Sequence, residues 1–121
     1  MHVLINGLKQ LPIGCSVNCG LHFLPMRTLI QTETYRRWFA ALRDSRAKAR
    51  INLRLRRVEL GGMGDCKPVA EGVSELRIDY GPGYRVYFVQ RSHEVIILLA
   101  GGDKASQARD IKSALTMARD L

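Results

Sequence analysis

Hydrophobic and polar residues alternate in two neighbouring segments, residues 74–80 and 84–88, which a Gly-Pro-Gly turn joins. Successive side chains of a β-strand point to opposite faces, so alternation of this kind predicts a β-hairpin with two chemically different faces. One face carries Leu76, Ile78, Tyr80, Tyr84, Val86 and Phe88. The other face carries Glu75, Arg77, Asp79, Arg85 and Tyr87. We therefore expect the first face to pack in a core and the second to place two arginines beside two carboxylates.

The segment before this hairpin predicts a short strand followed by helix. The strand is expected at residues 28–31, and Thr32 is placed to cap the helix that follows. Apolar residues then recur at helical spacing at Tyr35, Trp38, Phe39 and Leu42, and again at Ala47, Ile51, Leu55 and Val58. Asp44-Ser45 can restart a helix that ends before Gly61-Gly62. The pattern indicates either a helical hairpin or one kinked helix.

The C-terminal part predicts a buried strand and a closing helix. Residues 95–99 are all apolar, which is typical of a central strand covered on both faces. Gly101-Gly102 ends this strand, and Asp103 can cap a helix whose apolar side carries Ala108, Ile111, Leu115 and Ala118. With 121 residues, the chain is predicted to form one small α+β domain with a mostly antiparallel sheet of three or four strands.

The first 25 residues differ from the rest, because Lys9 is their only charged residue apart from histidines. Polar residues and Pro12 interrupt the apolar positions, so we expect neither a secretory signal nor a membrane span. We expect the functional domain to comprise residues 26–121, beginning at Met26. Residues 1–25 are interpreted as a poorly ordered extension or a misassigned start.

The cysteines indicate a reducing compartment. Cys15, Cys19 and Cys66 cannot form an even-numbered disulfide framework, so a cytoplasmic protein is expected. Cys15, Cys19 and His22 have a loosely metal-like spacing but no fourth ligand. We therefore predict no metal site.

The charge is strongly basic and unevenly distributed. The formal net charge is +8, and nine of the nineteen Lys and Arg residues lie between Arg36 and Arg57, where Asp44 is the only acid. Such an excess is explained either by a solvated helix surface or by a binding surface for phosphates, to which Arg54 and Arg57 would contribute. Charge alone does not distinguish RNA, DNA and a membrane surface as the partner.

From Met26 onward, the chain resembles the RelE/HigB-like toxins of bacterial type II toxin-antitoxin modules, in the branch called addiction module killer proteins. The resemblance covers about 96 residues and rests on residues 32–38, 76–88, 99–104 and 109–111. Its most specific blocks are Gly-Pro-Gly-Tyr-Arg-Val-Tyr and Gly-Gly-Asp-Lys. It implies a RelE/ParE-like fold, with the sheet packed against an N-terminal helical hairpin and a C-terminal helix.

The resemblance also implies an activity and its partners. Such toxins cleave messenger RNA, commonly on the ribosome, without a cofactor, and a cognate helix-turn-helix antitoxin holds them inactive. The 2′-hydroxyl of the RNA attacks the adjacent phosphate, so the enzyme must orient the strand, accept a proton and neutralise charge on the phosphate oxygens. Arg85 aligns with the family's catalytic strand arginine, and a guanidinium binds phosphate bidentately. Arg77 and Lys104 lie near two further basic positions of the family.

The proton acceptor and the function class stay open at this point. Glu75 and Asp110 are the candidate bases, whereas His93 is expected in a loop. Arg77 and Arg85 would have a structural role if they only formed surface ion pairs, and Lys104 if it were only solvated. The same fold also occurs in gyrase-inhibiting toxins, and a nontoxic basic module that binds RNA or a partner is a further alternative.

Overall fold

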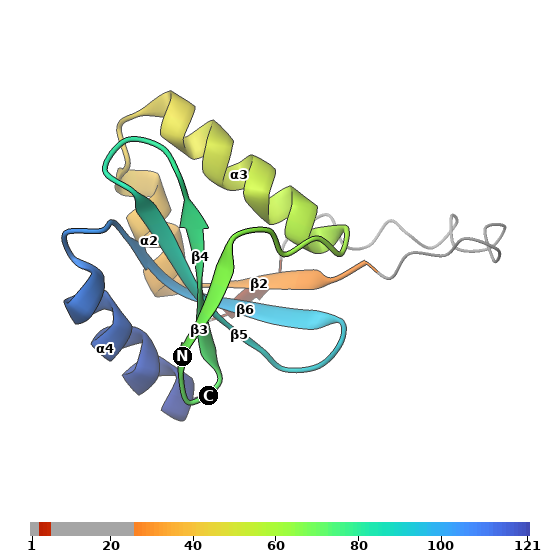
Figure 1. Cartoon of the computed structure of the whole chain (residues 1–121). Helices are drawn as coiled ribbons and strands as arrows, with labels where there is room; N and C mark the ends of the chain where they lie inside the picture. Colours follow the sequence, from red (N-terminus) through yellow and green to blue (C-terminus); the bar gives the residue numbers. More distant parts are fainter. Residues whose placement is uncertain (1–2, 6–25) are drawn as a thin grey trace, which may run out of the picture.

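A computed structural model describes residues 3–5 and 26–121 of the chain (Figure 1). The strands are β1 (Val3–Ile5), β2 (Thr28–Thr32), β3 (Cys66–Ala70), β4 (Val73–Ile78), β5 (Tyr84–Gln90) and β6 (Val95–Gly102). The helices are α2 (Glu33–Ala41), α3 (Ser45–Glu59) and α4 (Gln107–Arg119). The strands form one sheet in the order β1-β2-β6-β5-β4-β3, in which only β2 and β6 are parallel neighbours. The predicted α+β class with a mostly antiparallel sheet is confirmed.

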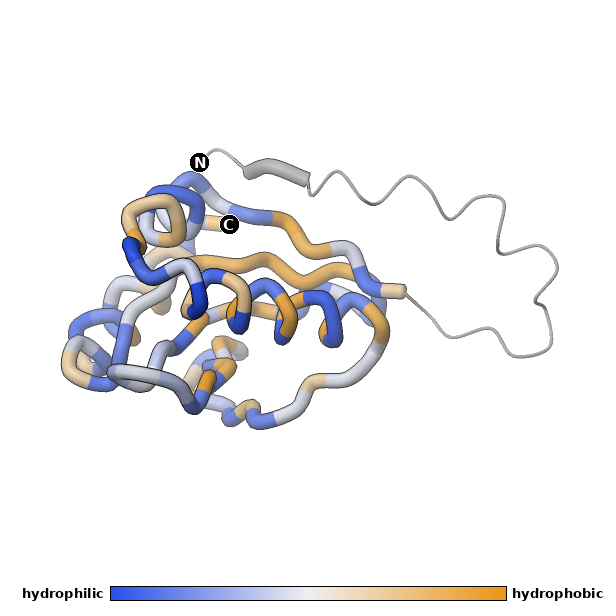
Figure 2. The backbone as a smooth tube through the Cα atoms, turned by 90° about the horizontal axis from the view of Figure 1, so that it is seen from above, coloured by the Kyte–Doolittle hydropathy of each residue, from blue (hydrophilic) through white to orange (hydrophobic). Residues whose placement is uncertain are grey.

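Helices cover both faces of this sheet, with α3 and α4 on opposite sides (Figure 1). Buried residues of α2 and α3 pack with one set of strand side chains, which includes Leu76, Val86 and Leu98. Residues of α4 pack with the opposite set, which includes Tyr87 and Leu99. Hydrophobic stretches accordingly follow the strands, whereas hydrophobic and hydrophilic residues alternate along the helices (Figure 2).

The sequence pattern before the hairpin is confirmed in detail. Thr32 is the N-cap of α2, and its hydroxyl accepts a hydrogen bond from the backbone N–H of Tyr35 at 3.2 Å. Residues 42–44 separate α2 from α3, so the two form a hairpin and not one kinked helix. The Asp44 carboxylate caps α3 by accepting from the backbone N–H groups of Arg46 and Ala47, and these bonds lower the pKa of Asp44. All four predicted apolar residues of α3 are buried.

The alternation of the β4–β5 hairpin is also confirmed, but its charged face is not open. Leu76 and Ile78 lie in the core beneath α2 and α3, as expected. On the other face, however, Glu75 is 2% exposed and Tyr87 is fully buried. The cause is α4, which packs over this face and contacts both β4 and β5. The predicted central strand β6 is covered on both faces.

Three predictions about the elements are wrong. The sheet has six strands and not three or four, because β1 and β3 extend its edges. Asp103 does not cap α4, since its side chain accepts from the Ser106 backbone N–H and the helix begins only at Gln107. Ala108 is exposed, and Ala114 is the fully buried alanine of that helix.

The expectation for residues 1–25 stays a prediction, since only β1, which pairs antiparallel with β2, belongs to the described part. Cys15, Cys19 and His22 lie outside the described residues. None of the described helices is long and apolar enough to cross a membrane.

Candidate functional site

A hollow of about 380 Å³ opens at the tip of the β4–β5 hairpin, beside the segment that follows β6. Its lining residues are Asp65, Arg77, Ile78, Asp79, Gly81, Pro82, Gly83, Arg85 and Lys104. The strand register explains why the basic residues meet there. Arg77 lies directly opposite Arg85 on the neighbouring strand, and Arg85 lies opposite Gly102, two residues before Lys104. The fold thus brings together three of the predicted site residues.

Arg85 lines the hollow and is mostly buried. Its Nη1 donates hydrogen bonds to the carbonyl oxygens of Gly83 at 3.1 Å and Tyr84 at 3.2 Å. Its Nε lies 3.9 Å from Glu75 Oε2, and only 12% of the side chain is exposed. The two hydrogen bonds of Nη1 therefore restrict the position of the guanidinium before any ligand binds, whereas its buried Nε has no hydrogen-bond partner among the described residues. A cation held in place in this way can stabilise developing charge with little reorganisation.

Arg77 lies at the rim and is paired with an acid that the sequence did not indicate. Its Nε and Nη2 donate to Asp65 Oδ1 at 3.1 and 2.9 Å, and this contact raises the pKa of Arg77. The backbone N–H of Arg77 also donates to the Asp65 carbonyl oxygen at 2.9 Å. Since 38% of the Arg77 side chain is exposed, its guanidinium is accessible to a ligand in the hollow.

Lys104 supplies the third positive charge and is exposed. Its backbone N–H lies 3.4 Å from the Pro82 carbonyl oxygen, which connects the segment after β6 to the hairpin turn. Gly83, in the turn, has a φ of +81°, a backbone conformation that favours glycine, whereas a Cβ there would make only ordinary contacts with Lys104 Cβ at 3.4 Å and Arg85 Nη1 at 3.5 Å.

Neither of the two predicted bases lines the hollow, because Glu75 lies on β4 beneath α4 and Asp110 lies in the first turn of α4 itself. Gln107 Nε2 donates to both carboxylate oxygens of Glu75, at 2.9 and 3.3 Å. Asp110 accepts a hydrogen bond from the Ser106 hydroxyl and is 16% exposed. On the same face as Glu75, Tyr87 contributes a buried hydroxyl with no hydrogen-bond partner among the described residues, and burial raises its pKa.

The carboxylates that do line the hollow are Asp65 and Asp79. Asp65 is occupied by Arg77, whereas Asp79 is exposed and has no ion pair within the described part of the chain. Asp79 lies on the charged face of the hairpin, so the alternating pattern contains a signal for it. Asp65 precedes β3 in a loop, and no sequence pattern indicates that it belongs to the site.

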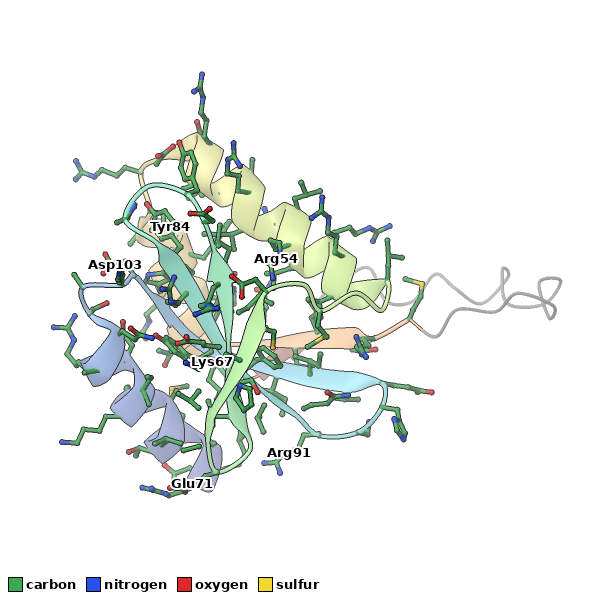
Figure 3. All side chains as sticks on the ribbon, in the orientation of Figure 1. Arg54, Lys67, Glu71, Tyr84, Arg91 and Asp103 are labelled. Carbon is green, nitrogen blue, oxygen red and sulfur yellow. The ribbon has the colours of Figure 1, made fainter. Side chains whose placement is uncertain are left out.

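The two arginines predicted from charge density have different surroundings. Arg54 extends from α3 toward the sheet (Figure 3) and donates to the carbonyl oxygens of Arg77, Met63 and Asp65. Burial lowers the pKa of Arg54, and its donors hold the loop before β3 against α3. Arg57 is exposed and lines a second hollow of about 230 Å³, between α3 and the end of β4. This second hollow shares Ile78 and Asp79 with the first.

The histidine that the structure describes is not part of the site. His93 is exposed in the loop between β5 and β6, as expected, and does not line the hollow. Within residues 3–5 and 26–121, no three His, Cys, Asp or Glu side chains are grouped so that they could hold a metal ion.

Comparison with known proteins adds one family and one relative. Residues 37–120 match the family described as phage derived protein Gp49-like (DUF891), and every residue that lines the hollow falls within this match. An uncharacterized protein of Haemophilus influenzae (strain Rd) is 48% identical over 90 residues, which are 74% of this chain and 91% of the relative. No solved structure matches.

Proposed function

Since this chain belongs to the family of Gp49-like phage-derived proteins, which is associated with addiction-module killer proteins, we propose that it is the toxin of a type II toxin-antitoxin module. We propose further that it is a metal-independent endoribonuclease of the RelE/HigB-like type. Its substrate is messenger RNA, cleaved on the ribosome in the cytoplasm, and its inhibitor is a cognate helix-turn-helix antitoxin.

The observation that carries this proposal is the convergence of Arg77, Arg85 and Lys104 around one hollow. Three cations around one recess, against the two carboxylates Asp65 and Asp79, suit a phosphodiester and the dianionic state through which its cleavage passes. Arg85 and Arg77 add planar donors that can bind two phosphate oxygens at once, whereas Lys104 contributes a point charge.

Four charged residues of the hollow can then be assigned roles in the cleavage. The 2′-oxygen forms a bond to phosphorus while the bond from phosphorus to the 5′-oxygen breaks, and the 5′-oxygen takes up a proton from water, which leaves a cyclic phosphate and a 5′-hydroxyl. Arg85 stabilises charge on the non-bridging oxygens, and Arg77 and Lys104 orient the strand. Asp79 is the exposed carboxylate of the hollow and accepts the 2′-proton. Glu75, which lies below, supports Arg85 and does not contact the RNA.

Primer-extension mapping of a defined message in a purified translation system tests this assignment. We compare the full chain with Arg85→Ala, Arg85→Lys and Asp79→Asn, and with Arg91→Ala as a control, since Arg91 is exposed after the end of β5 and does not line the hollow. Cuts within codons should fall by about 10²-fold to 10³-fold for Arg85→Ala, because it removes a donor aimed at developing charge. Arg91→Ala should cleave like the parent protein.

The outcome that refutes the proposal is equally specific. Translation without cuts in the presence of the folded full chain would exclude cleavage of messenger RNA. Full cleavage by a folded Arg85→Ala variant would exclude the assigned site. In the first case, inhibition of DNA gyrase is the next activity to assay.

A further inference from the structure

A buried carboxylate beneath α4 has two partners of different kinds. Glu75 is 2% exposed, and its Oε2 lies 3.9 Å from Arg85 Nε. Gln107, the first residue of α4, donates from Nε2 to both carboxylate oxygens of Glu75, at 2.9 and 3.3 Å. The arginine supplies a charge and the glutamine supplies hydrogen bonds, so a chain of contacts runs from α4 through Glu75 to Arg85 in the hollow.

The Gln107 amide is neutral, and this matters for the chain of contacts. A buried carboxylate needs a partner for its charge as well as donors for its oxygen atoms. A lysine or arginine at position 107 would donate to Glu75 but would also compete with Arg85 for the negative charge. The amide orients Glu75 and leaves its charge in place. Within the described part of the chain, Arg85 is the one cation that forms an ion pair with this carboxylate.

The two ends of the Arg85 guanidinium are held in different ways. At one end, Nη1 donates to the carbonyl oxygens of Gly83 and Tyr84. At the other end, Nε is buried without a hydrogen-bond partner among the described residues, and the nearby charge of Glu75 attracts it. If the Glu75 side chain turned away, Nε would lose this opposite charge in a buried environment. The orientation of Arg85 therefore depends on the rotamer of Glu75, which Gln107 fixes.

Close packing of α4 on the end of β6 fixes the position of Gln107. A Cβ at Gly102 would lie 2.7 Å from Asp110 Cγ and 2.9 Å from Ser106 Oγ, so the first turn of α4 touches the strand backbone. The Ser106 hydroxyl donates to the Asp110 carboxylate within that turn. The Gln107 backbone N–H lies 3.4 Å from the carbonyl oxygen of Lys104, which lines the hollow. One short segment thus places both Lys104 and Gln107.

We propose that Gln107 is a positioning residue of the candidate active site, a proposal that rests on the proposed function. Its amide holds Glu75 in the rotamer that fixes Arg85 for contact with a phosphate. Gln107 does not line the hollow, so its effect on cleavage passes through Glu75 and not through the RNA. If its hydrogen bonds only satisfied a buried carboxylate, Gln107 would stabilise the fold without affecting the cleavage step.

Cleavage kinetics in the purified translation system test this role on the full chain. The variants are Gln107→Leu, Glu75→Gln and the two together, since leucine preserves bulk and helix propensity but removes the donor. Gln107→Leu should lower the maximal cleavage rate by about tenfold to hundredfold and leave KM within about twofold, because Arg77 and Lys104 still bind the strand. In the double variant, Gln107→Leu should add less than about threefold to the loss caused by Glu75→Gln, because its target carboxylate is already absent.

NMR of the arginine side chains tests the positioning in the absence of RNA. Isotope-labelled arginine gives an Nε–Hε signal for Arg85, which is assigned by its loss in Arg85→Lys. In Gln107→Leu this signal should shift, and its hydrogen should exchange faster with water, because Nε is no longer held beside a fixed charge. The signal of Arg77, whose Nε donates to Asp65 at 3.1 Å, should stay unchanged.

Two further variants make the comparison fair. Gln107→Asn keeps an amide but shortens the side chain by one methylene, so it should change the Arg85 signal in the same direction even if Gln107→Leu does not fold. Gln90→Leu is the matched control, because it removes the same amide from an exposed glutamine that donates to the Ser92 carbonyl oxygen at 3.0 Å and does not line the hollow. It should leave the Arg85 signal and the cleavage rate as in the parent.

Other results overturn the proposal. An Arg85 signal that is unchanged in both Gln107 variants excludes the positioning role, and so does a loss from Gln107→Leu that is equal with and without the Glu75 carboxylate. A raised KM with an unchanged maximal rate excludes it as well, since it would place Gln107 in strand binding. A parent protein that cuts no message while its Arg85 signal responds to Gln107 refutes the proposed function but supports the control of Arg85 by Gln107.

Discussion

The ion pair between Glu75 and Arg85 should stabilise the fold more than the shorter pair between Arg77 and Asp65. The perturbation is Glu75→Gln and Arg85→Gln, made singly and together. Glutamine preserves the size of the glutamate side chain and leaves an acceptor for Gln107, so the main loss is the charge. Because Glu75 and Arg85 are in contact, the double variant measures their coupling and not the sum of two independent effects.

The expected coupling free energy between Glu75 and Arg85 depends more on the burial of the two side chains than on the distance between their charged atoms. At the 3.9 Å that separates Arg85 Nε from Glu75 Oε2, with side-chain exposures of 12% and 3%, the attraction is about 4 kcal/mol at an effective dielectric constant near 20. The carbonyl oxygens of Gly83 and Tyr84 continue to stabilise the guanidinium when Glu75 is replaced. We therefore expect a coupling free energy of about 2 kcal/mol in the free energy of unfolding.

Two double-mutant cycles, one for each ion pair, are measured under the same conditions by urea unfolding, with the fluorescence of the single tryptophan, Trp38, as the signal. The matched cycle is Asp65→Asn with Arg77→Gln, whose side chains are 52% and 38% exposed although their atoms approach to 2.9 Å. Solvent screening should make that coupling clearly smaller, and it should weaken further in salt. Equal coupling in the two cycles would refute the reasoning that burial outweighs distance here.

Three further predictions concern the packing of the helices. Gly102→Ala should destabilise by about 2–3 kcal/mol or more, because its Cβ would overlap the Asp110 carboxylate and the Ser106 hydroxyl. Gly72→Ala, at φ +83° with open space around it, should cost only about 1–2 kcal/mol of backbone strain. Equal losses of unfolding free energy for Gly102→Ala and Gly72→Ala in urea would contradict the predicted steric overlap at Gly102. Thr32→Val should cost about 2 kcal/mol, because Thr32 is fully buried and its hydroxyl caps α2 and donates to β6; the exposed Thr34→Val should be near neutral in the same assay. Arg119 lowers the pKa of Glu71 through a hydrogen bond, so this contact stabilises fully above the ordinary glutamate pKa of about 4.3 and is lost as pH falls through the lowered value. Unfolding midpoints between about pH 6 and pH 3 should therefore drop less for Glu71→Gln than for the parent, and identical pH profiles would show that the contact is absent in solution.

Local periodicity was sufficient to predict most of the fold. The buried line of α3 and the two faces of the β4–β5 hairpin depend only on which residues recur at helical or strand spacing. The same alternation predicted that Arg77 and Arg85 share a face, and the register places them opposite each other. The sequence did not predict β3, because Pro68 interrupts the strand and its pairing with β4 is irregular between Pro68 and Ala70.

The parts of the site that could not be predicted depend on contacts between distant segments. The alternating pattern shows that Glu75 and Tyr87 share the charged face, but it does not show that α4 covers them. Asp65 lies next to Arg77 only because the loop before β3 folds back along β4. Charge density likewise does not distinguish Arg57, which is exposed, from Arg54, whose donors are occupied by carbonyl oxygens.

The parallel pairing of β2 with β6 has a consequence for how the protein is made. β6 lies between β2 and β5, so the middle of the sheet is closed by a strand near the C-terminal end, where Val95 pairs with Thr28. Such a long-range pairing is formed slowly, because a large loop must close first. Arg77 and Arg85 can meet within a local hairpin, but Lys104 joins them only after β6 has docked. A nascent chain that is still being translated therefore lacks the third cation, and the complete hollow exists only once nearly the whole sequence has been synthesised.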